Sequence, residues 1–240
     1  MKLTLGMPHL NYHGLDQVWL SKQLGHRHWE LLGDGPAYSK NNERLYASFF
    51  CCSIDFNRGQ DQYKEGDEVT VNSKVFKFNN QIYRSTHDIR GHRNISTAIF
   101  DSIFVRKDLA TNTLVRDDPH AQGHEIAQTD FVFIEEHKKL KKELRSEDFS
   151  SNLVQLQFNP ETYFNAVKIL YFANYLNLVS QCEYLFYPEL KAPIKQIKTY
   201  YFANINPTDQ VYGITTKQDN VYTTKLVAND RAIAVCNVSR

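Results

Sequence analysis

The sequence predicts an α+β protein with a double hot dog architecture, in which each of two units wraps a curled antiparallel sheet around one central helix. Three observations favour this architecture. Phe164–Phe186 is apolar on nearly every side at helical spacing, which indicates a helix enclosed by other elements. Four runs rich in β-branched and aromatic residues follow it. A helix followed by four such runs also makes up the first half.

The second half shows this pattern most clearly. The length of its central helix would also suit a membrane span, but several polar side chains interrupt the apolar run and argue against lipid. They are Lys168, Asn174, Asn177, Gln181 and Glu183. Turn residues separate the strands that are expected after the helix. These strands are Ile194–Asn206, Gln210–Lys217, Asn220–Val227 and Arg231–Val238.

The first half repeats the order. Leu15, Val18 and Leu24 have helical spacing, and we expect Gly25 to stop or kink this helix before a second helical piece. Asn79-Asn80 is predicted to form a tight hairpin turn between two of the following strands. The predicted strands are Glu43–Phe56, Glu68–Phe78, Gln81–Arg90 and Ile95–Arg106. The two helices begin 150 residues apart (164 − 14 = 150), so the repeat is one of architecture.

The chain is therefore expected to divide into an N-terminal unit over residues 1–134, a charged helical linker over 135–150 and a C-terminal unit over 151–240. Glu135–Glu147 alternates acidic and basic residues, which is typical of a solvated helix. Lys107–Thr129 is predicted to be a long loop, either a lid or a surface excursion.

Composition excludes several classes of function. The 28 Lys and Arg nearly balance the 27 Asp and Glu, so nothing indicates nucleic-acid binding. None of the four cysteines forms a C-x-x-C pair, which predicts a reduced cytosolic protein and no metal site. The N-terminus lacks the apolar stretch of a signal peptide, and no segment qualifies as a membrane span.

One segment resembles a known family. Asn165–Tyr175 (NAVKILYFANY) is similar to the helix signature of double hot dog acyl-thioester enzymes of polyketide-type biosynthetic clusters, such as the leinamycin-type bifunctional acyltransferase/decarboxylases. Leu45–Phe50 resembles the Tyr-x-x-Phe strand of that family, and Asp67–Phe78 resembles its next strand. Two positions depart from the pattern. Tyr163 stands where members often carry Asp, and Ala166 stands where they carry Gly.

The resemblance implies an enzyme that acts on acyl-CoA or acyl-carrier-protein thioesters, by acyl transfer, by decarboxylation of a malonyl-type thioester, or by both. It implies no cofactor besides the CoA or phosphopantetheine of the substrate, and a monomer or homodimer. Decarboxylation is compatible with the absence of the Asp that Tyr163 replaces, because this reaction needs hydrogen-bond donors to an enolate oxygen rather than a strong base.

Three residues are candidates for catalysis. Tyr46 matches the tyrosine that the resemblance assigns to the active site, where a neutral phenol would donate to a thioester or enolate oxygen. The alternative is a strand tyrosine with its ring in the core. Asp16 at the first helix start is a candidate base, or a charge that complements the helix dipole. His13 would position a water, or it is a surface histidine.

Three further residues are candidates for substrate binding. Gly14 lies at a helix start, where backbone N–H groups form an oxyanion site that glycine lets a ligand approach. Asn165 is expected to begin the central helix, and either caps it or holds the thioester. Tyr171 shares a helix face with Tyr175, a position that is more often core.

Two other functions stay open. A hot dog thioesterase or dehydratase usually needs a carboxylate or histidine base, so it would depend on Asp16 and His13. A non-catalytic acyl-thioester-binding protein is favoured by the departures at Tyr163 and Ala166.

Overall fold

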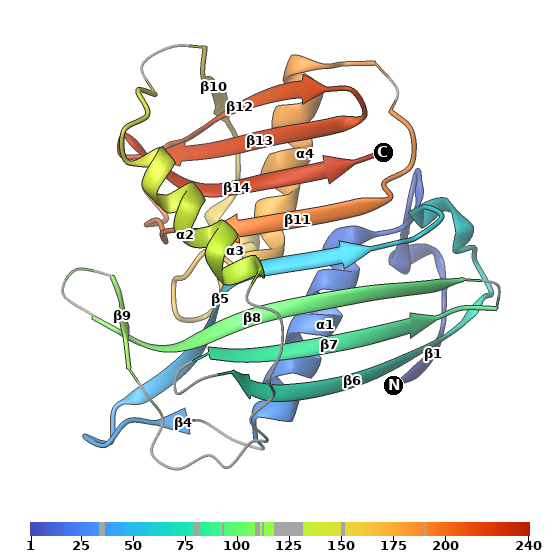
Figure 1. The fold of residues 1–240 in the computed structure, drawn as a ribbon, viewed down its shortest axis with the longest axis horizontal. Helices are drawn as coiled ribbons and strands as arrows, with labels where there is room; N and C mark the ends of the chain where they lie inside the picture. The colour runs from blue at the N-terminus through green and yellow to red at the C-terminus, as the bar shows by residue number, and fades with distance from the viewer. Residues whose placement is uncertain are drawn as a thin grey trace.

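The computed structural model describes residues 1–33, 37–78, 82–92, 94–108, 111, 113–117, 132–149, 152–189 and 191–240. Within these ranges twelve strands form one continuous sheet, in the order β1-β6-β7-β8-β5-β11-β14-β13-β12-β10, with β4 also paired to β5 and β9 to β8 (Figure 1). Every neighbouring pair is antiparallel. The strands are β1 (Lys2–Thr4), β4 (Ala37–Tyr38), β5 (Arg44–Asp55), β6 (Glu68–Phe78), β7 (Ile82–Arg90), β8 (Ile95–Lys107), β9 (Leu114–Arg116), β10 (Val154–Leu156), β11 (Gln196–Tyr201), β12 (Val211–Gln218), β13 (Val221–Ala228) and β14 (Arg231–Ser239). A separate hairpin joins β2 (Leu10–Asn11) to β3 (Gly14–Leu15).

Each half of the sheet carries one long helix on the same face. α1 (Gln17–Leu32) crosses the half that contains β6, and α4 (Tyr175–Phe186) crosses β12 and β13. α2 (Val132–Leu144) lies on the opposite face, over the junction between the halves (Figure 1). The short α3 (Pro160–Tyr163) and single 3-10 turns at Met7–His9, Gln60–Gln62 and Phe172–Asn174 complete the fold.

The eight long strands occur where the runs of β-branched and aromatic residues predict them. β5, β6, β7 and β8 agree with the four runs of the first half to within one residue at each end. β12, β13 and β14 agree equally well, whereas β11 stops at Tyr201 instead of reaching Asn206. The order of helix and four strands, found twice, confirms the predicted α+β architecture.

Three predictions about helices are wrong. α1 is continuous across Gly25, which does not stop it. The second long helix begins at Tyr175 rather than Phe164, because the Asn165 side chain binds nearby backbone N–H groups and diverts the chain into a turn. The linker helix begins at Val132, three residues before the predicted start.

Two predicted loops are only partly described. The segment Lys107–Thr129 contains β9, so its described part is a strand rather than a plain loop. The expected turn at Asn79-Asn80 and most of the rest of Lys107–Thr129 lie outside the described residues.

A chain of buried hydroxyls and imidazoles crosses the N-terminal half beneath α1. His28 bonds Ser102 Oγ at 2.8 Å and Ser85 Oγ at 2.6 Å. Ser85 Oγ also lies 2.8 Å from His87 Nε2, and His87 Nδ1 lies 2.8 Å from Ser73 Oγ. Burial, and to a lesser degree the positive charge of Arg27, lower the pKa of His87 to about 3. His87 is therefore neutral in the folded protein at all but strongly acidic pH.

This pKa predicts a loss of stability in acid. His87 binds a proton near pH 6.5 in the unfolded protein but only near pH 3 in the folded protein. The contribution of neutral His87 to the unfolding free energy is therefore fully present above pH 6.5 and declines as the pH falls from 6.5 toward 3. Between pH 7.5 and pH 5 the loss amounts to about 2 kcal/mol of unfolding free energy. Urea unfolding of the wild type and His87→Gln at both pH values measures it. The difference in unfolding free energy between the wild type and His87→Gln should be about 2 kcal/mol smaller at pH 5 than at pH 7.5. An unchanged difference would contradict the lowered pKa of His87.

Gly213 lets α4 approach the sheet closely. A Cβ at this β12 residue would lie 2.7 Å from Cys182 Sγ and 3.2 Å from Leu156 Cδ1. We expect Gly213→Ala to lower the unfolding free energy by about 1–3 kcal/mol through overpacking. Denaturant unfolding measures the loss, and Gly6→Ala, at a glycine with φ = −124° and a single contact at 3.8 Å, shows the effect of the same change without overpacking.

Candidate functional site

The two halves of the sheet separate where β5 and β11 diverge. β11 pairs with β5 only from Cys51 to Asp55, and β4 pairs with Arg44 and Leu45. Among the described strands none covers residues 46–50 on this edge of β5. A β-bulge at Phe50 marks the point of divergence. Bulges of this kind redirect side chains and end strand pairing, and they are frequent beside active sites.

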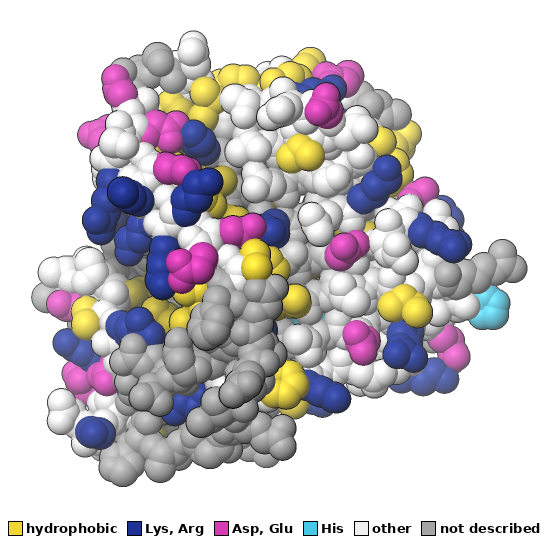
Figure 2. All heavy atoms as spheres, viewed as in Figure 1, with side chains coloured by type: hydrophobic (Ala, Val, Ile, Leu, Met, Phe, Trp, Pro, Cys, Tyr) yellow, Lys and Arg dark blue, Asp and Glu magenta, His cyan; other side chains and the backbone are white. Residues whose placement is uncertain are grey.

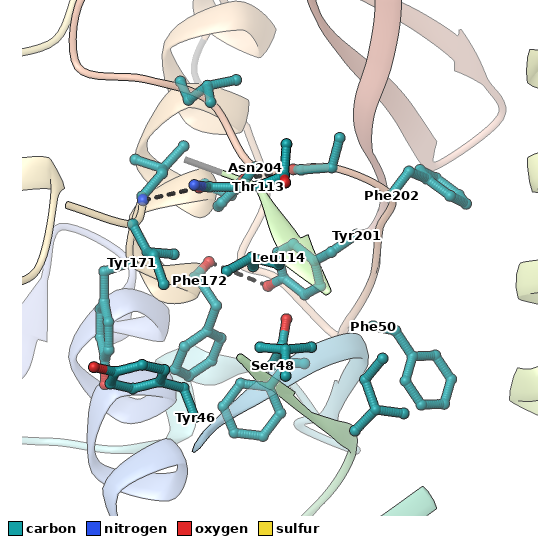
Figure 3. A pocket seen from close by; sticks show the side chains of 18 of the residues that line it. Tyr46, Ser48, Phe50, Thr113, Leu114, Tyr171, Phe172, Tyr201, Phe202 and Asn204 are labelled. Carbon is teal, nitrogen blue, oxygen red and sulfur yellow. Dashed lines mark hydrogen bonds between the residues drawn. The ribbon is translucent and has the colours of Figure 1, made fainter. Parts of the chain in front are cut away.

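A pocket of about 640 Å³ occupies the divergence. Both halves line it, because α1 and β5 contribute from one side and the segments after α3 and after β11 contribute from the other. β9 and α2 complete the wall. Its volume suits a small-molecule or cofactor-sized ligand. Figure 3 shows Tyr46, Ser48 and Phe50 of β5 facing Tyr171, Phe172 and Tyr201 across the pocket.

The loop before α4 is held in place by hydrogen bonds from both halves. Asn165 Oδ1 accepts from the N–H groups of Val167 and Ile169, at 3.1 and 3.0 Å. Asn204 Oδ1, in the segment after β11, accepts from Leu170 N–H at 3.1 Å (Figure 3). Lys107 Nζ at the end of β8 donates to the Val167 carbonyl. The loop is thus a fixed part of the pocket wall.

The tyrosines of the pocket differ in what their hydroxyls do. Tyr175 donates to the Ala203 carbonyl at 3.1 Å, and Tyr201 donates to the Phe172 carbonyl at 3.2 Å. Tyr46 and Tyr171 have no such partner in the described part of the chain. Burial raises the pKa of Tyr171, so its phenol keeps its proton near neutral pH. These two phenols are therefore available donors.

Two imidazoles also line the pocket. His26 on α1 lies 3.2 Å from Glu30 Oε1 and is 70% exposed, which places it at the mouth. His137 on α2 lies with its Nε2 3.0 Å from the Tyr201 carbonyl, with its ring stacked on Phe202. A carbonyl only accepts, so Nε2 carries the hydrogen and Nδ1 keeps a lone pair. Burial lowers the pKa of His137, and Lys141 lowers it further, although the Tyr201 bond opposes them.

The pocket brings together three of the six predicted site residues. Tyr46, Asn165 and Tyr171 line it, although Asn165 belongs to the fixed loop and does not begin α4 as expected. The other three predicted residues do not line it. They are His13, Gly14 and Asp16, at and before the start of α1.

Local structure explains the positions of His13, Gly14 and Asp16. Asp16 is the N-cap of α1, and its Oδ1 accepts from Trp19 N–H at 2.6 Å. Gly14 has φ = 117°, and a Cβ there would lie 2.3 Å from the Gln60 carbonyl oxygen, so the position requires glycine for packing. Burial lowers the pKa of His13, and the nearby Arg240 and Lys191 lower it further.

The chemistry of the described side chains offers no obvious metal site. Within the described ranges, no group of three or more His, Cys, Asp or Glu is arranged to hold a metal ion. All four cysteines are buried free thiols. No described helix combines the length and apolar character that crossing a membrane requires.

Comparisons with known proteins give likeness in structure but not in sequence. No protein-family model and no curated protein matches the sequence. A 12:0-ACP thioesterase from Umbellularia californica superposes with a TM-score of 0.71 at 10% identity, over 100% of this chain and 95% of that one. An acyl-ACP thioesterase from Bacteroides thetaiotaomicron gives 0.65 at 10% identity, over 100% and 96%. A protein from Alicyclobacillus acidocaldarius described as having a hot dog fold gives 0.52 at 9% identity, over 99% and 90%.

The fold is a double hot dog. The two units of this double hot dog meet at the β5–β11 pair, and the pocket lies at one end of that junction. α1 and α4 lie on the same face of the shared sheet, and each packs its buried side into the core. α4 is not fully enclosed, because Tyr184 and Leu185 are exposed.

Sequence reasoning missed Phe172, Asn204 and His137. The sequence predicts a regular buried helix at Phe172, whereas this residue lies in a 3-10 turn and reaches into the pocket. His137 lies within the charged segment that the pattern predicts to be a solvated linker. The sequence predicts a strand at Asn204, whereas this residue follows the end of β11. No sequence signal marks His137 or Asn204, because their roles depend on contacts between the halves.

Asp16→Ala separates capping from catalysis. We expect a loss of about 1 kcal/mol in unfolding free energy, because the variant removes the side-chain acceptor for Trp19 N–H. Binding and turnover of acyl thioesters should stay at the wild-type level, since Asp16 does not line the pocket. Urea unfolding and a thiol-release assay check both parts, and a large loss of turnover in a stable protein would show that the carboxylate takes part in the reaction.

Proposed function

We propose that this protein binds an acyl thioester, carried on CoA or on an acyl carrier protein, in the pocket between its units and hydrolyses it. The observation that supports this most is the inter-unit pocket of about 640 Å³, walled by aromatic side chains, in a chain whose full length superposes on acyl-ACP thioesterases. The acyl chain would lie against Trp29 and Phe172. The phenols of Tyr46 and Tyr171 are free to donate to the thioester oxygen.

The exposed edge of β5 suits the arm that carries the acyl group. Residues 46–50 present backbone groups that no described strand pairs on this side. The two amides of phosphopantetheine match such groups in the way an added strand does. The arm would therefore lie along β5 and deliver the thioester to the two phenols.

Hydrolysis needs a proton acceptor and donors to the developing oxyanion. Water attacks the carbonyl carbon, its proton goes to His137 Nδ1, and the carbon–sulfur bond breaks as the thiol leaves with a proton. Tyr46 and Tyr171 stabilise the negative charge on the carbonyl oxygen. The hydrogen bond from His137 Nε2 to the Tyr201 carbonyl fixes the tautomer that this role requires.

A second candidate is decarboxylation of a malonyl-type thioester. The unpaired, protonated phenol of Tyr171 favours it, because an enolate needs a neutral donor and the reaction needs no base. In this reaction the bond from Cα to the carboxylate breaks, carbon dioxide leaves, and the electron pair forms the enolate. The thioester itself stays intact.

Tyr46→Phe and Tyr171→Phe test the donors. We expect each substitution to lower kcat for acyl-CoA hydrolysis by about 100-fold, as loss of one oxyanion donor does. Tyr184→Phe is the matched control, because Tyr184 is 62% exposed and does not line the pocket. Free thiol and intact thioester are followed by mass spectrometry with acyl-CoA and malonyl-CoA. Thiol release supports hydrolysis, loss of carbon dioxide alone supports decarboxylation, and binding without change would show a non-catalytic protein.

The pH profile tests His137. A base must be unprotonated, and burial lowers the pKa of His137, so kcat should hold its plateau below pH 6.5 and fall only in more acidic solution. His137→Gln should remove that acid limb and lower kcat while leaving thioester affinity within a few-fold. His26→Gln is the control at the pocket mouth. If His26→Gln rather than His137→Gln abolished turnover, the base would be assigned to α1.

A further inference from the structure

Phe172 separates the pocket from the interior of the N-terminal unit. Its ring lies 4.4 Å from that of Phe49 and 5.8 Å from that of Phe100, measured between centroids. Phe49 and Phe172 line the pocket, whereas Phe100 is fully buried behind them. Figure 3 shows the Phe172 ring directed toward β5, between Tyr171 and Ser48. The ring therefore closes the inner end of the pocket.

Gly25 makes this arrangement possible. A Cβ at Gly25 would lie 2.5 Å from Cζ and 2.6 Å from Cε1 of Phe172, which is far inside van der Waals contact. Glycine is unfavourable within a helix, yet it occurs in the middle of α1. The groove left by the missing side chain holds the edge of the Phe172 ring. The C-terminal unit thus supplies a side chain that fits a gap in the helix of the N-terminal unit.

We propose that Phe172, seated on Gly25, is the end wall of the acyl site and sets the longest acyl chain that the protein accepts. This inference rests on the proposed acyl-thioester function. An acyl chain that enters from the β5 edge meets the Phe172 ring before it reaches Phe100. Phe100 belongs to the N-terminal core, so the position of the Phe172 ring decides the depth of the site.

Substitutions at Phe172 and at Gly25 are expected to shift the preferred acyl-chain length in opposite directions. Phe172→Leu shortens the side chain and opens the inner end, so longer chains should fit. Gly25→Ala forces the Phe172 ring away from α1 and into the pocket, so only shorter chains should fit. In the double variant the added methyl has no ring to displace, and the two effects should not be additive.

The experiment measures affinity without turnover. S-alkyl-CoA thioethers from butyl to hexadecyl are titrated into the protein by calorimetry. In the wild type, affinity should rise about fourfold for each added CH₂ until the chain reaches Phe172, and then fall. Phe172→Leu should move the optimum to longer chains and bind them about tenfold more tightly than the wild type. Gly25→Ala should move it to shorter chains.

A control variant and folding measurements distinguish a change in the end wall from general destabilisation of the protein. Phe186→Leu removes the same atoms from a half-buried phenylalanine on α4 that does not line the pocket, and should leave the optimum unchanged. Circular dichroism and thermal unfolding confirm that each variant is folded, and Gly25→Ala tests the inference independently of Phe172→Leu. If all variants bind the same alkyl-chain length most tightly, Phe172 is not the end wall of the site, and the proposed function stands. If the wild type binds no thioether, neither on CoA nor on an acyl carrier protein loaded with the same alkyl chains, the proposed function fails and the inference fails with it.

Discussion

The pairing of β5 with β11 is the interaction on which the rest of the structure depends. Five residue pairs, from Cys51–Tyr200 to Asp55–Gln196, join two half-sheets into one. Without them each half would expose the long edge of a strand, which invites association with other chains. The pairing is also short, since β5 has twelve residues and β11 has six. The unmatched part of β5 is what leaves room for a pocket.

Contacts that cross the junction give the pocket its walls. α2 covers the opposite face of the sheet at this point, where Ile134 packs with Phe50, Cys51 and Tyr200. Figure 2 shows basic side chains mixed with acidic ones over α2, so its outer face is solvated while its inner face is apolar. From the other face, the 3-10 turn before α4 inserts Phe172 against α1. Each unit therefore completes a site that it cannot form alone.

The polar groups of the pocket combine two tyrosine hydroxyls with two imidazoles, and His137 keeps a lone pair on Nδ1. Tyr46 and Tyr171 offer hydroxyls as hydrogen-bond donors, while His26 lies at the mouth of the pocket and His137 lies on α2. Hydrolysis and decarboxylation place different demands on these groups, since only hydrolysis requires His137 to accept a proton. The thioester chemistry proposed here follows from that arrangement.

The sequence by itself determined the architecture. Runs rich in β-branched and aromatic residues, separated by turn residues, placed β5 to β8 and β12 to β14 almost to the residue, because strand propensity and turn signals are local. It also proposed Tyr46, Asn165 and Tyr171, which do line the pocket. The start of α4 and the continuity of α1 depended on tertiary contacts. The Asn165 side chain turns the chain by accepting hydrogen bonds from backbone N–H groups a few residues further on. Gly25 leaves space for the ring of Phe172, which is 147 residues away (172 − 25 = 147). His137 and Asn204 join the site only because β11 ends early beside β5, and no local pattern encodes where two distant strands part.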